Sequence, residues 1–326
     1  MTHGVFSGYM AYSFIPLIFA RSLDSDDSRQ RHARLALSGV EHRVSPGVYA
    51  DKLVWDALTP RDQYIHRIRA VVETRAFDPV VVSHESAAAL HGLPVLGSWP
   101  RQVHVTIGRS NGGKSRGEIV KHSVEIPDVD VTTVAGLRVT AVARTVIDLA
   151  ANAKFMNAVV VADHALRLDR WGKREPLCTP DAIRAALDRR LPARAHARIS
   201  RVIGFATAQS DSPLESVSRV NMHAVGLPRP VLQQRFSDYR GLIGFSEFYW
   251  PEYKLVGEAD GRSKYTDPRY RNGRTLEEVL LDEKKRADRL RAIGLDVSRW
   301  GWDIGVNPES LRRHLEAAGL PSGQPW

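Results

Sequence analysis

The stretch Phe245-Ser-Glu-Phe-Tyr-Trp-Pro-Glu-Tyr-Lys-Leu-Val-Gly-Glu-Ala-Asp-Gly261 decides our prediction for the fold of the C-terminal part of the chain. Its pattern predicts two short strands joined by a tight Trp-Pro-Glu turn. Side chains alternate with a period of two in a strand, so Glu247 shares a face with aromatic neighbours. In the second strand, Glu258 and Asp260 share a face with Val256.

Acidic side chains on hydrophobic strands are unfavourable inside a protein unless something compensates their charge. A divalent cation is one candidate, because Mg²⁺ binds carboxylate oxygens and usually keeps several waters. The alternative is that both faces are solvated and the acids are ordinary surface residues.

The segments around this stretch predict an α, β, β, β, α, β order. We expect a helix at 213–225, a strand at 231–236, the two strands above, a helix at 276–293 and a strand at 296–300. A last helix is expected at 311–318. The first of these helices begins at Ser212-Pro-Leu-Glu215, where Glu215 also fits a capping box.

The chain has 326 residues, which suggests two or three domains. Its net charge of +9 and pI near 9.8 favour an anionic partner, with nucleic acid first; a merely basic protein is the alternative. The single cysteine, Cys178, excludes an internal disulfide and fits a reducing cytoplasm.

Residues 9–20 are apolar, but no Lys or Arg precedes them, Pro16 interrupts them, and the segment is too short to span a bilayer. We therefore expect the first helix of a soluble domain here and no membrane segment; the alternative is a targeting role.

A second helix is expected at 24–38, followed by a hairpin at 41–49 with Pro46-Gly47 at its tip. This order is typical of a winged helix, whose second helix enters the major groove and whose hairpin contacts phosphate. The candidate contacts are Arg29, Arg31, Arg34 and Arg43. Helix pairs followed by a hairpin also occur without DNA.

The middle of the chain predicts a small α/β domain. Helices are expected at 58–73, 83–91, 142–150 and 155–166, and strands at 80–82, 102–107, 118–123, 129–133 and 137–140. Its histidines, His84, His91, His104 and His122, match no zinc-binding spacing, so we predict no metal site there. Residues 167–201 then carry ten Lys or Arg and four acids, which suits either phosphate contacts or a solvated connector.

The C-terminal part, from Ser212 to Asp303, resembles the Vsr-like branch of the PD-(D/E)xK nuclease fold. The resemblance rests on Glu258-Ala-Asp-Gly-Arg-Ser-Lys-Tyr265, on the helix that carries Glu283-Lys284 and Asp288-Arg-Leu-Arg291, and on Gly294-Leu-Asp-Val-Ser-Arg-Trp300. It implies Mg²⁺-dependent cleavage of DNA, in which a carboxylate-held ion stabilises charge and activates water.

The same resemblance implies the site residues. Glu247, Glu258 and Asp260 would hold Mg²⁺, Lys264 would act on the water or the phosphate, and Glu215 would complete the acidic cluster. The chain departs from the pattern at three of these positions. Glu247 stands where Asp is usual, Asp260 stands in the slot of the motif's Lys, and Lys264 stands where several relatives have His.

The front of the chain resembles the AbiEi-type antitoxin family. The matching segments are Arg43-Val-Ser-Pro-Gly-Val-Tyr49, Val82-Ser-His-Glu-Ser-Ala-Ala-Ala-Leu-His-Gly-Leu-Pro94 and Leu137-Arg-Val-Thr-Ala-Val-Ala-Arg-Thr-Val-Ile-Asp-Leu149. This resemblance implies a winged-helix head that binds double-stranded DNA, and a place in a bacterial toxin–antitoxin locus with a protein toxin as partner.

We therefore expect an α+β multi-domain protein in the cytoplasm. The expected parts are a winged-helix-like head at 1–76, an antitoxin-like α/β domain at 77–166, a basic helical connector at 167–208 and a restriction-endonuclease-like αβββαβ domain at 209–326. Two functions stay open. One is a Mg²⁺-dependent DNA endonuclease, and the other is a regulator or antitoxin whose tail only binds.

Overall fold

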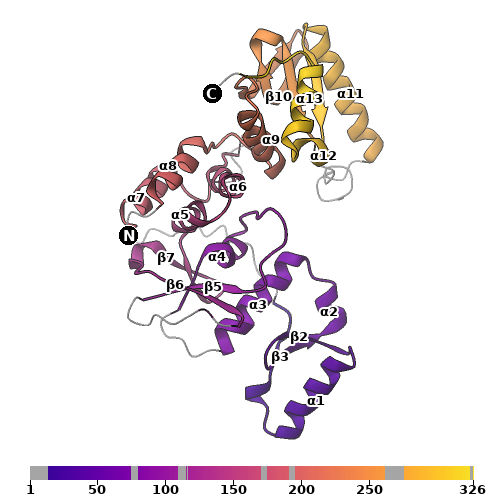
Figure 1. Cartoon of the computed structure of the whole chain (residues 1–326). Coiled ribbons are helices and arrows are strands. Elements are labelled where there is room, and N and C mark those ends of the chain that lie inside the picture. The colour runs from indigo at the N-terminus through magenta and orange to yellow at the C-terminus, as the bar shows by residue number, and fades with distance from the viewer. Residues whose placement is uncertain are drawn as a thin grey trace, which may run out of the picture. The chain divides into compact units, whose positions relative to one another are not determined.

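A computed structural model describes residues 14–74, 80–108, 115, 117–169, 175–190, 195–260, 275–323 and 326 (Figure 1). The protein is α+β, as predicted, and the described residues form three sheets. The chain divides into two compact units. Unit 1 comprises Met1–Val161 and Leu177–Gly204, and unit 2 comprises Ala162–Pro176 and Phe205–Trp326.

Unit 1 begins with a three-stranded antiparallel sheet in the order β1-β3-β2. Its elements are β1 (Ile18–Phe19), α1 (Asp26–Leu37), β2 (Glu41–Ser45), β3 (Val48–Asp51) and the short α2 (Lys52–Asp56). Ser25 caps α1 by accepting the Ser28 N–H. Gly47 has a φ of +77°, which lets the β2–β3 turn close tightly.

The helix expected at 9–20 is wrong for residues 14–20, and residues 9–13 lie outside the described part. Ile18–Phe19 forms β1 and pairs with Tyr49 and Val48, and a 3₁₀ turn follows at Ala20–Ser22. Two features of the sequence explain this. Pro16 disfavours a helix, and the apolar residues Ile15, Leu17 and Phe19 alternate like a strand and pack on the same small core.

The rest of unit 1 is built on a mixed five-stranded sheet in the order β6-β5-β4-β8-β7. The strands are β4 (Val81–Val82), β5 (Val103–Ile107), β6 (Ile119–Ser123), β7 (Val131–Val134) and β8 (Leu137–Thr140). The helices are α3 (Pro60–Thr74), α4 (His84–His91), α5 (Val142–Asn152) and α6 (Phe155–Leu166), the last of which leads into unit 2. Apolar residues of α3 and α4 pack against this sheet and form a hydrophobic core with it.

Helices α7 (Pro180–Asp188) and α8 (His196–Phe205) lie in the segment that the sequence suggested was a basic connector. Here α7 packs against α5, and Arg189 pairs with the buried Asp130 at 2.5 Å. Part of the basic charge in this segment is therefore used in contacts within unit 1.

Unit 2 has the predicted α, β, β, β, α, β order. Its elements are α9 (Pro213–Ala224), β9 (Val231–Asp238), β10 (Gly241–Trp250), β11 (Leu255–Ala259), α11 (Leu276–Ala292), β12 (Asp296–Trp300), α12 (Trp302–Gly305) and α13 (Pro308–Ala317). The sheet order is β12-β11-β10-β9, and β11 and β12 are parallel.

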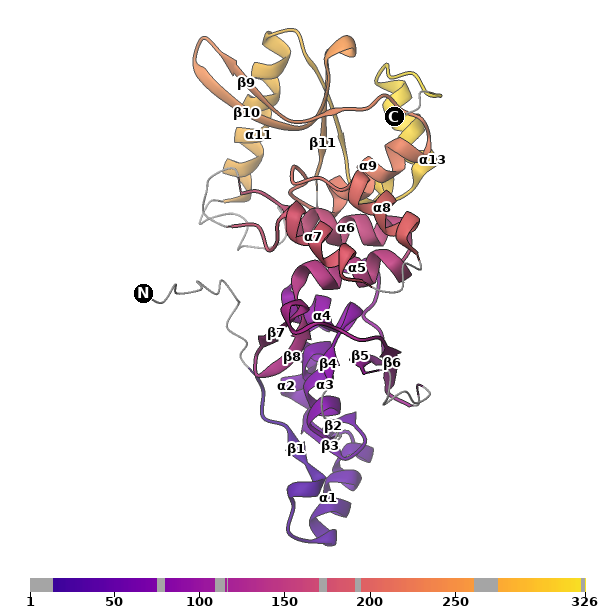
Figure 2. The same ribbon diagram turned by 90° about the vertical axis from the view of Figure 1, so that its left-hand side faces the viewer.

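The two faces of this sheet are covered by different helices (Figure 2). On one face α11 packs over Ile243 and Val256, with Leu290 from the helix. On the other face α9 and α13 pack over Phe248 and Trp250. The central strands β10 and β11 are therefore covered on both faces, and their acids, Glu247 and Glu258, lie inside the unit.

Candidate functional site

The predicted strand acids of unit 2 lie together at the C-terminal end of β11. Glu247 and Glu258 are 9% and 4% exposed, so the interpretation of them as solvated surface acids is wrong. The pairing of Phe248 with Gly257 brings Glu247 beside the end of β11, where a Glu247 carboxylate oxygen accepts the Ala259 N–H at 2.5 Å. Ala259 stands between the other two predicted ligands.

A guanidinium compensates the second of these acids. Arg286 of α11 donates to Glu258 Oε1 at 2.9 Å and to the Phe245 carbonyl oxygen at 2.5 Å. Gly244, at a φ of +145°, leaves space for this arginine, since a Cβ there would lie 3.0 Å from Arg286 Nε. The bulge in β10 at Leu242 and Gly244 therefore serves the contact between Arg286 and Glu258.

Arg299 of β12 extends this network of charges. Its Nη1 lies 3.8 Å from Asp260 Oδ2 and 3.4 Å from Glu283 Oε2 of α11. We call Glu247, Glu258, Asp260 and Glu283 the carboxylate cluster. Two arginines sit among these acids, which lowers the repulsion that four buried or half-buried negative charges would otherwise have.

Glu215, the acid predicted from the first helix of this part, is joined to the same region through Gln233. Its carboxylate accepts the Asp211 N–H at 2.9 Å and the Gln233 amide at 3.2 Å. The register of β9 and β10 places Gln233 beside Glu247. Only one of the two hydrogen bonds of a capping box is present. The Ser212 hydroxyl accepts the Glu215 N–H, but the Glu215 carboxylate accepts the N–H of Asp211 instead of that of the cap residue Ser212.

Gln233 has two unusual properties. Its φ is +54°, a conformation that a non-glycine side chain rarely adopts and that is often found at functional sites. Because its amide nitrogen donates to Glu215, its Oε1 points away from Glu215, where it is buried and has no hydrogen-bond partner among the residues that the structure describes.

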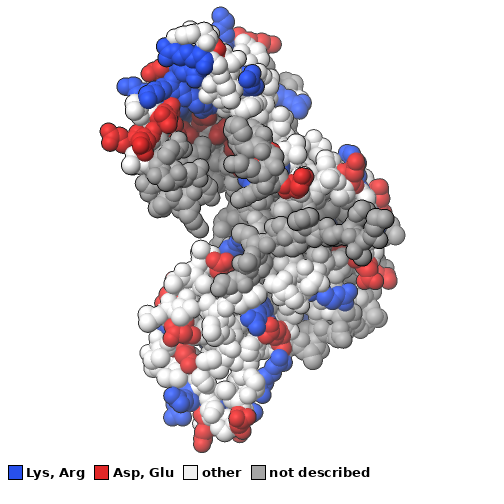
Figure 3. Space-filling view, turned by 180° about the vertical axis from the view of Figure 1, so that it is seen from behind, with Lys and Arg blue, Asp and Glu red and all other residues white. Residues whose placement is uncertain are grey.

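The oxygen donors fit Mg²⁺ in chemical type, but they are not gathered into a ready binding site. Among the described residues, no three carboxylates have ligand atoms within 4.8 Å of one another. Lys264, the predicted catalytic lysine, lies outside the described residues. Figure 3 shows Lys and Arg side chains gathered on the surface of unit 2 beside acidic ones, and the exposed basic residues of α11 include Lys284 and Lys285.

In unit 1, α1 presents the predicted DNA-binding arginines on its outer side. Arg31 and Arg34 are exposed, three residues apart, and so lie on the same stripe of the helix. Neither has a carboxylate partner within the described part of the chain. The opposite side of α1 is tied to β2, because His32 Nδ1 bonds the Glu41 carboxylate at 2.8 Å.

Arg29 was a candidate contact from the sequence, but the structure uses it internally. Its guanidinium pairs with Asp26 at 2.8 Å and donates to the carbonyl oxygens of Ala20 and Leu23. These bonds fasten the start of α1 to the chain that precedes it. Arg29 is therefore a residue that holds the helix in place.

Arg43, on β2, opens onto a cavity that the sequence did not predict. The cavity has a volume of about 370 Å³ and is also lined by Arg67 of α3 and by Arg101. Arg67 Nε is buried and has no hydrogen-bond partner in the described part of the chain. We call this space the arginine cavity. It holds three guanidinium groups and one acid, Glu118, so it suits an anion such as phosphate.

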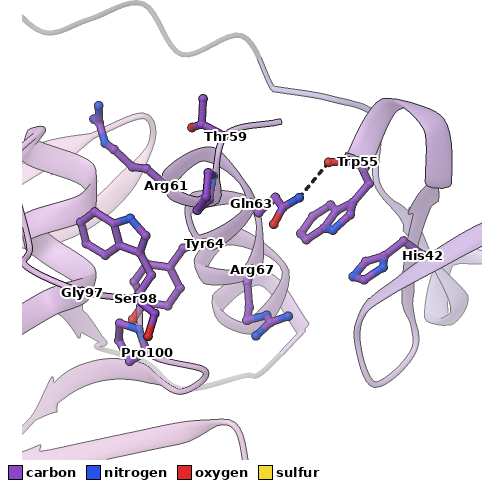
Figure 4. A pocket seen from close by; sticks show the side chains of 12 residues that line it. His42, Trp55, Thr59, Arg61, Gln63, Tyr64, Arg67, Gly97, Ser98 and Pro100 are labelled. Carbon is purple, nitrogen blue, oxygen red and sulfur yellow. Dashed lines mark hydrogen bonds between the residues drawn. The ribbon is translucent and has the colours of Figure 1, made fainter. Parts of the chain in front are cut away.

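A second cavity, of about 720 Å³, shares Arg67 with the first (Figure 4). Aromatic residues form its walls. His42 stacks on Trp55 with ring centroids 4.5 Å apart, and Tyr64 stacks on Trp99 at 5.5 Å. Burial and the nearby Arg67 lower the pKa of His42, so this ring adds no positive charge.

The sequence also failed to predict a group of histidines. His84, His104 and His122, which we call the histidine cluster, have ligand atoms within 4.8 Å of one another. They come from α4, β5 and β6, and no local spacing connects them. His91, the fourth histidine considered, bonds the Thr140 carbonyl oxygen through Nε2 and is not part of the cluster.

Comparison with known proteins assigns no activity to this chain. No protein-family model matches it. It is similar to uncharacterized proteins of Mycobacterium tuberculosis, from strains CDC 1551 / Oshkosh and ATCC 25618 / H37Rv, with 26% identity over 195 residues in each case. The similar region covers 57% of this chain and 65% of each relative, slightly less than two thirds of their length. None of the helices in the described residues has the length and apolar character needed to cross a bilayer.

Proposed function

We propose that this protein binds double-stranded DNA through α1 and the β2–β3 hairpin of unit 1. The observation that carries the proposal is the arginine cavity. Arg43, Arg67 and Arg101 converge there from three parts of the chain, and a buried guanidinium nitrogen of Arg67 has no partner within the described residues. A phosphate in the cavity would offset the mutual repulsion of the three arginine side chains.

Part of the arrangement around the cavity supports a winged-helix interpretation of the head, although residues 14–20 do not form the first helix of that order. A helix stands between the first two strands of a β1-β3-β2 sheet, and a tight hairpin follows. In such modules the helix enters the major groove and the hairpin contacts the backbone. This assigns Arg31 and Arg34 to the groove, and Arg43 to a phosphate beside it.

The resemblance of the front to the AbiEi-type family supports a regulatory role for this binding. The protein would then act as a DNA-binding regulator or antitoxin in a bacterial toxin–antitoxin locus, with a protein toxin as its partner. Unit 2 would serve as a further binding module, and the exposed lysines of α11 beside the carboxylate cluster suit contact with nucleic acid.

Fluorescence anisotropy with a labelled DNA duplex tests the proposal. The double variant Arg31→Ala/Arg34→Ala should bind at least about tenfold more weakly, since each lost contact to DNA is worth on the order of 1 kcal/mol. Arg138→Ala is the matched control, because it removes an exposed charge of unit 1 whose nearest carboxylate is 3.7 Å away, at Asp128. Equal binding by all three proteins would move the contact elsewhere.

DNA cleavage by unit 2 is a second candidate function. It is favoured by the orphaned Gln233 Oε1 beside Glu247, because an amide oxygen and carboxylates are ligands that Mg²⁺ accepts. Glu247, Glu258 and Asp260 would hold the ion, which would stabilise phosphate charge and supply an activated water. Glu258 would first have to share its carboxylate between Arg286 and the ion.

Calorimetric titration with Mn²⁺ decides on this second function. Binding that is lost in Glu258→Gln, together with metal-dependent nicking of a plasmid, would support it. Equal heats of binding in the wild type and in Glu258→Gln at millimolar Mn²⁺, with no nicking, would leave unit 2 as a binding module.

A further inference from the structure

The histidine cluster has the geometry of a metal site. His104 and His122 lie on neighbouring parallel strands, where Thr106 pairs with His122, so the two side chains are on the same face. His84, the first residue of α4, reaches the same place, and its ring stacks on that of His122 with centroids 3.6 Å apart. Three elements thus bring three imidazoles to one point.

The spacing of the nitrogen atoms agrees with tetrahedral coordination. Zn–N bonds of about 2.0–2.1 Å place two ligands of a tetrahedral ion about 3.3 Å apart. His104 Nδ1 and His122 Nε2 are 3.2 Å apart and share a hydrogen bond, so an ion bound to both nitrogens would replace the proton between them. Glu85 Oε2 lies 3.2 Å from His104 Nδ1 and is buried without a hydrogen bond among the described residues. It is not in the group of three ligand atoms that all lie within 4.8 Å of one another, so Glu85 would become a fourth ligand by a change of its side-chain rotamer.

Burial keeps the pKa of each of the three imidazoles low. Burial lowers the pKa of His104 and of His122 to about 4, and burial together with the neighbouring histidines lowers the pKa of His84 well below its ordinary value.

The backbone and the outer partners of His84 also suit ligation. His84 has a φ of +51°, a strained value for a non-glycine residue, which the surrounding structure must hold. Asn152 lies 3.2 Å from its Nε2 and Ser83 Oγ lies 3.0 Å from its Nδ1. An ion would bind one ring nitrogen of His84. The hydrogen bond at the other ring nitrogen would then orient the ring, as such bonds do for metal-bound histidines.

We propose that His84, His104 and His122, with Glu85 as the fourth ligand, bind one divalent transition-metal ion of the Zn²⁺ class. Imidazole donors select Zn²⁺ and its neighbours in the transition series over Mg²⁺. Four protein ligands make a closed, structural site. The ion joins α4 to β5 and to the edge strand β6, and so fastens one side of the five-stranded sheet.

Titration of the full chain with Co²⁺ at neutral pH tests this proposal, because a tetrahedral Co²⁺ ion absorbs visible light strongly. We expect saturation at one equivalent, no displacement by excess Mg²⁺, displacement by Zn²⁺, and a Tm that rises with Zn²⁺ by mass action. The double variant His104→Gln/His122→Gln should bind more than about 100-fold more weakly, since even outer partners are worth about 10–100-fold. His196→Gln, at an exposed histidine of unit 1, is the matched control and should bind like the wild type.

Two results would overturn the proposal. One is a wild-type protein with no saturable Co²⁺ absorption at one equivalent. The other is unchanged affinity in the double variant. If circular dichroism shows that the double variant does not fold, the Glu85→Gln variant decides. A weaker and altered Co²⁺ spectrum in that variant supports the site. An unchanged spectrum and an unchanged affinity rule out Glu85 as a ligand and the four-ligand site with it.

Discussion

Replacing Arg286 tests how unit 2 tolerates its buried acids. Arg286→Met keeps most of the aliphatic volume but removes the donor that bonds Glu258 at 2.9 Å. The Glu258 side chain is only 6% exposed, so water cannot take over the lost contact fully. The same change also leaves the Phe245 carbonyl oxygen without this donor.

The expected loss follows from burial. Removing one partner of a buried ion pair typically destabilises a protein by about 3–5 kcal/mol. The Arg286 side chain is 24% exposed, so the pair is not fully dry and we expect a value near the lower end, about 3 kcal/mol. Adding Glu258→Gln to the Arg286→Met variant removes the carboxylate charge that has lost its arginine. This second change should restore about half of the lost free energy of unfolding.

Hydrogen exchange of the β10 and β11 amides, measured by mass spectrometry, reports the opening of unit 2 separately from unit 1. A loss of about 3 kcal/mol makes this exchange roughly 100-fold faster. Arg291→Met is the control, because its pair with Asp288 is more than half exposed and should be worth less than about 1 kcal/mol. If Arg286→Met is as mild as this control, the guanidinium does not compensate Glu258, and our account of the cluster is refuted.

Three further predictions concern smaller parts of the molecule. Gly244→Ala should destabilise unit 2 by about 1–3 kcal/mol, since its φ is positive and the new Cβ meets Arg286; an unchanged exchange rate in β10 would contradict this. Arg29→Ala should lower the thermal stability of α1 as well as DNA affinity, whereas Arg31→Ala should lower affinity alone, as circular dichroism and anisotropy would show. In metal-free protein the histidine cluster has lowered pKa values, so below about pH 6.5 the unfolded chain binds more protons than the native one. The stability of unit 1 should therefore fall as the pH falls from 6.5 towards 4, and a urea midpoint that stays constant over that range would disprove it.

Local patterns were enough to predict the elements of unit 2. The helix predicted at 276–293 and the strand predicted at 296–300 agree closely with α11 (Leu276–Ala292) and β12 (Asp296–Trp300). The positions of Glu247 and Glu258 on their strands were also predictable. Their partners were not, because Arg286 belongs to a helix that packs on the sheet only in three dimensions.

The parts of the site that the sequence missed share one property. The arginine cavity combines residues 43, 67 and 101, and the histidine cluster combines residues 84, 104 and 122, so no short window contains either set. The wrong first helix has a different origin. There the short apolar run at residues 14–20 fits a strand as well as a helix, and Pro16 disfavours the helix.

The salt dependence of DNA binding tests the central claim most directly. Anisotropy titrations between low and moderate salt would compare the wild type with the triple variant Arg43→Ala/Arg67→Ala/Arg101→Ala. If these arginines contact phosphates, the slope of log affinity against log salt should become shallower by about 3, since each contact contributes about 0.9. Equal slopes and equal affinities for the two proteins would contradict the proposal that the arginine cavity binds the DNA backbone.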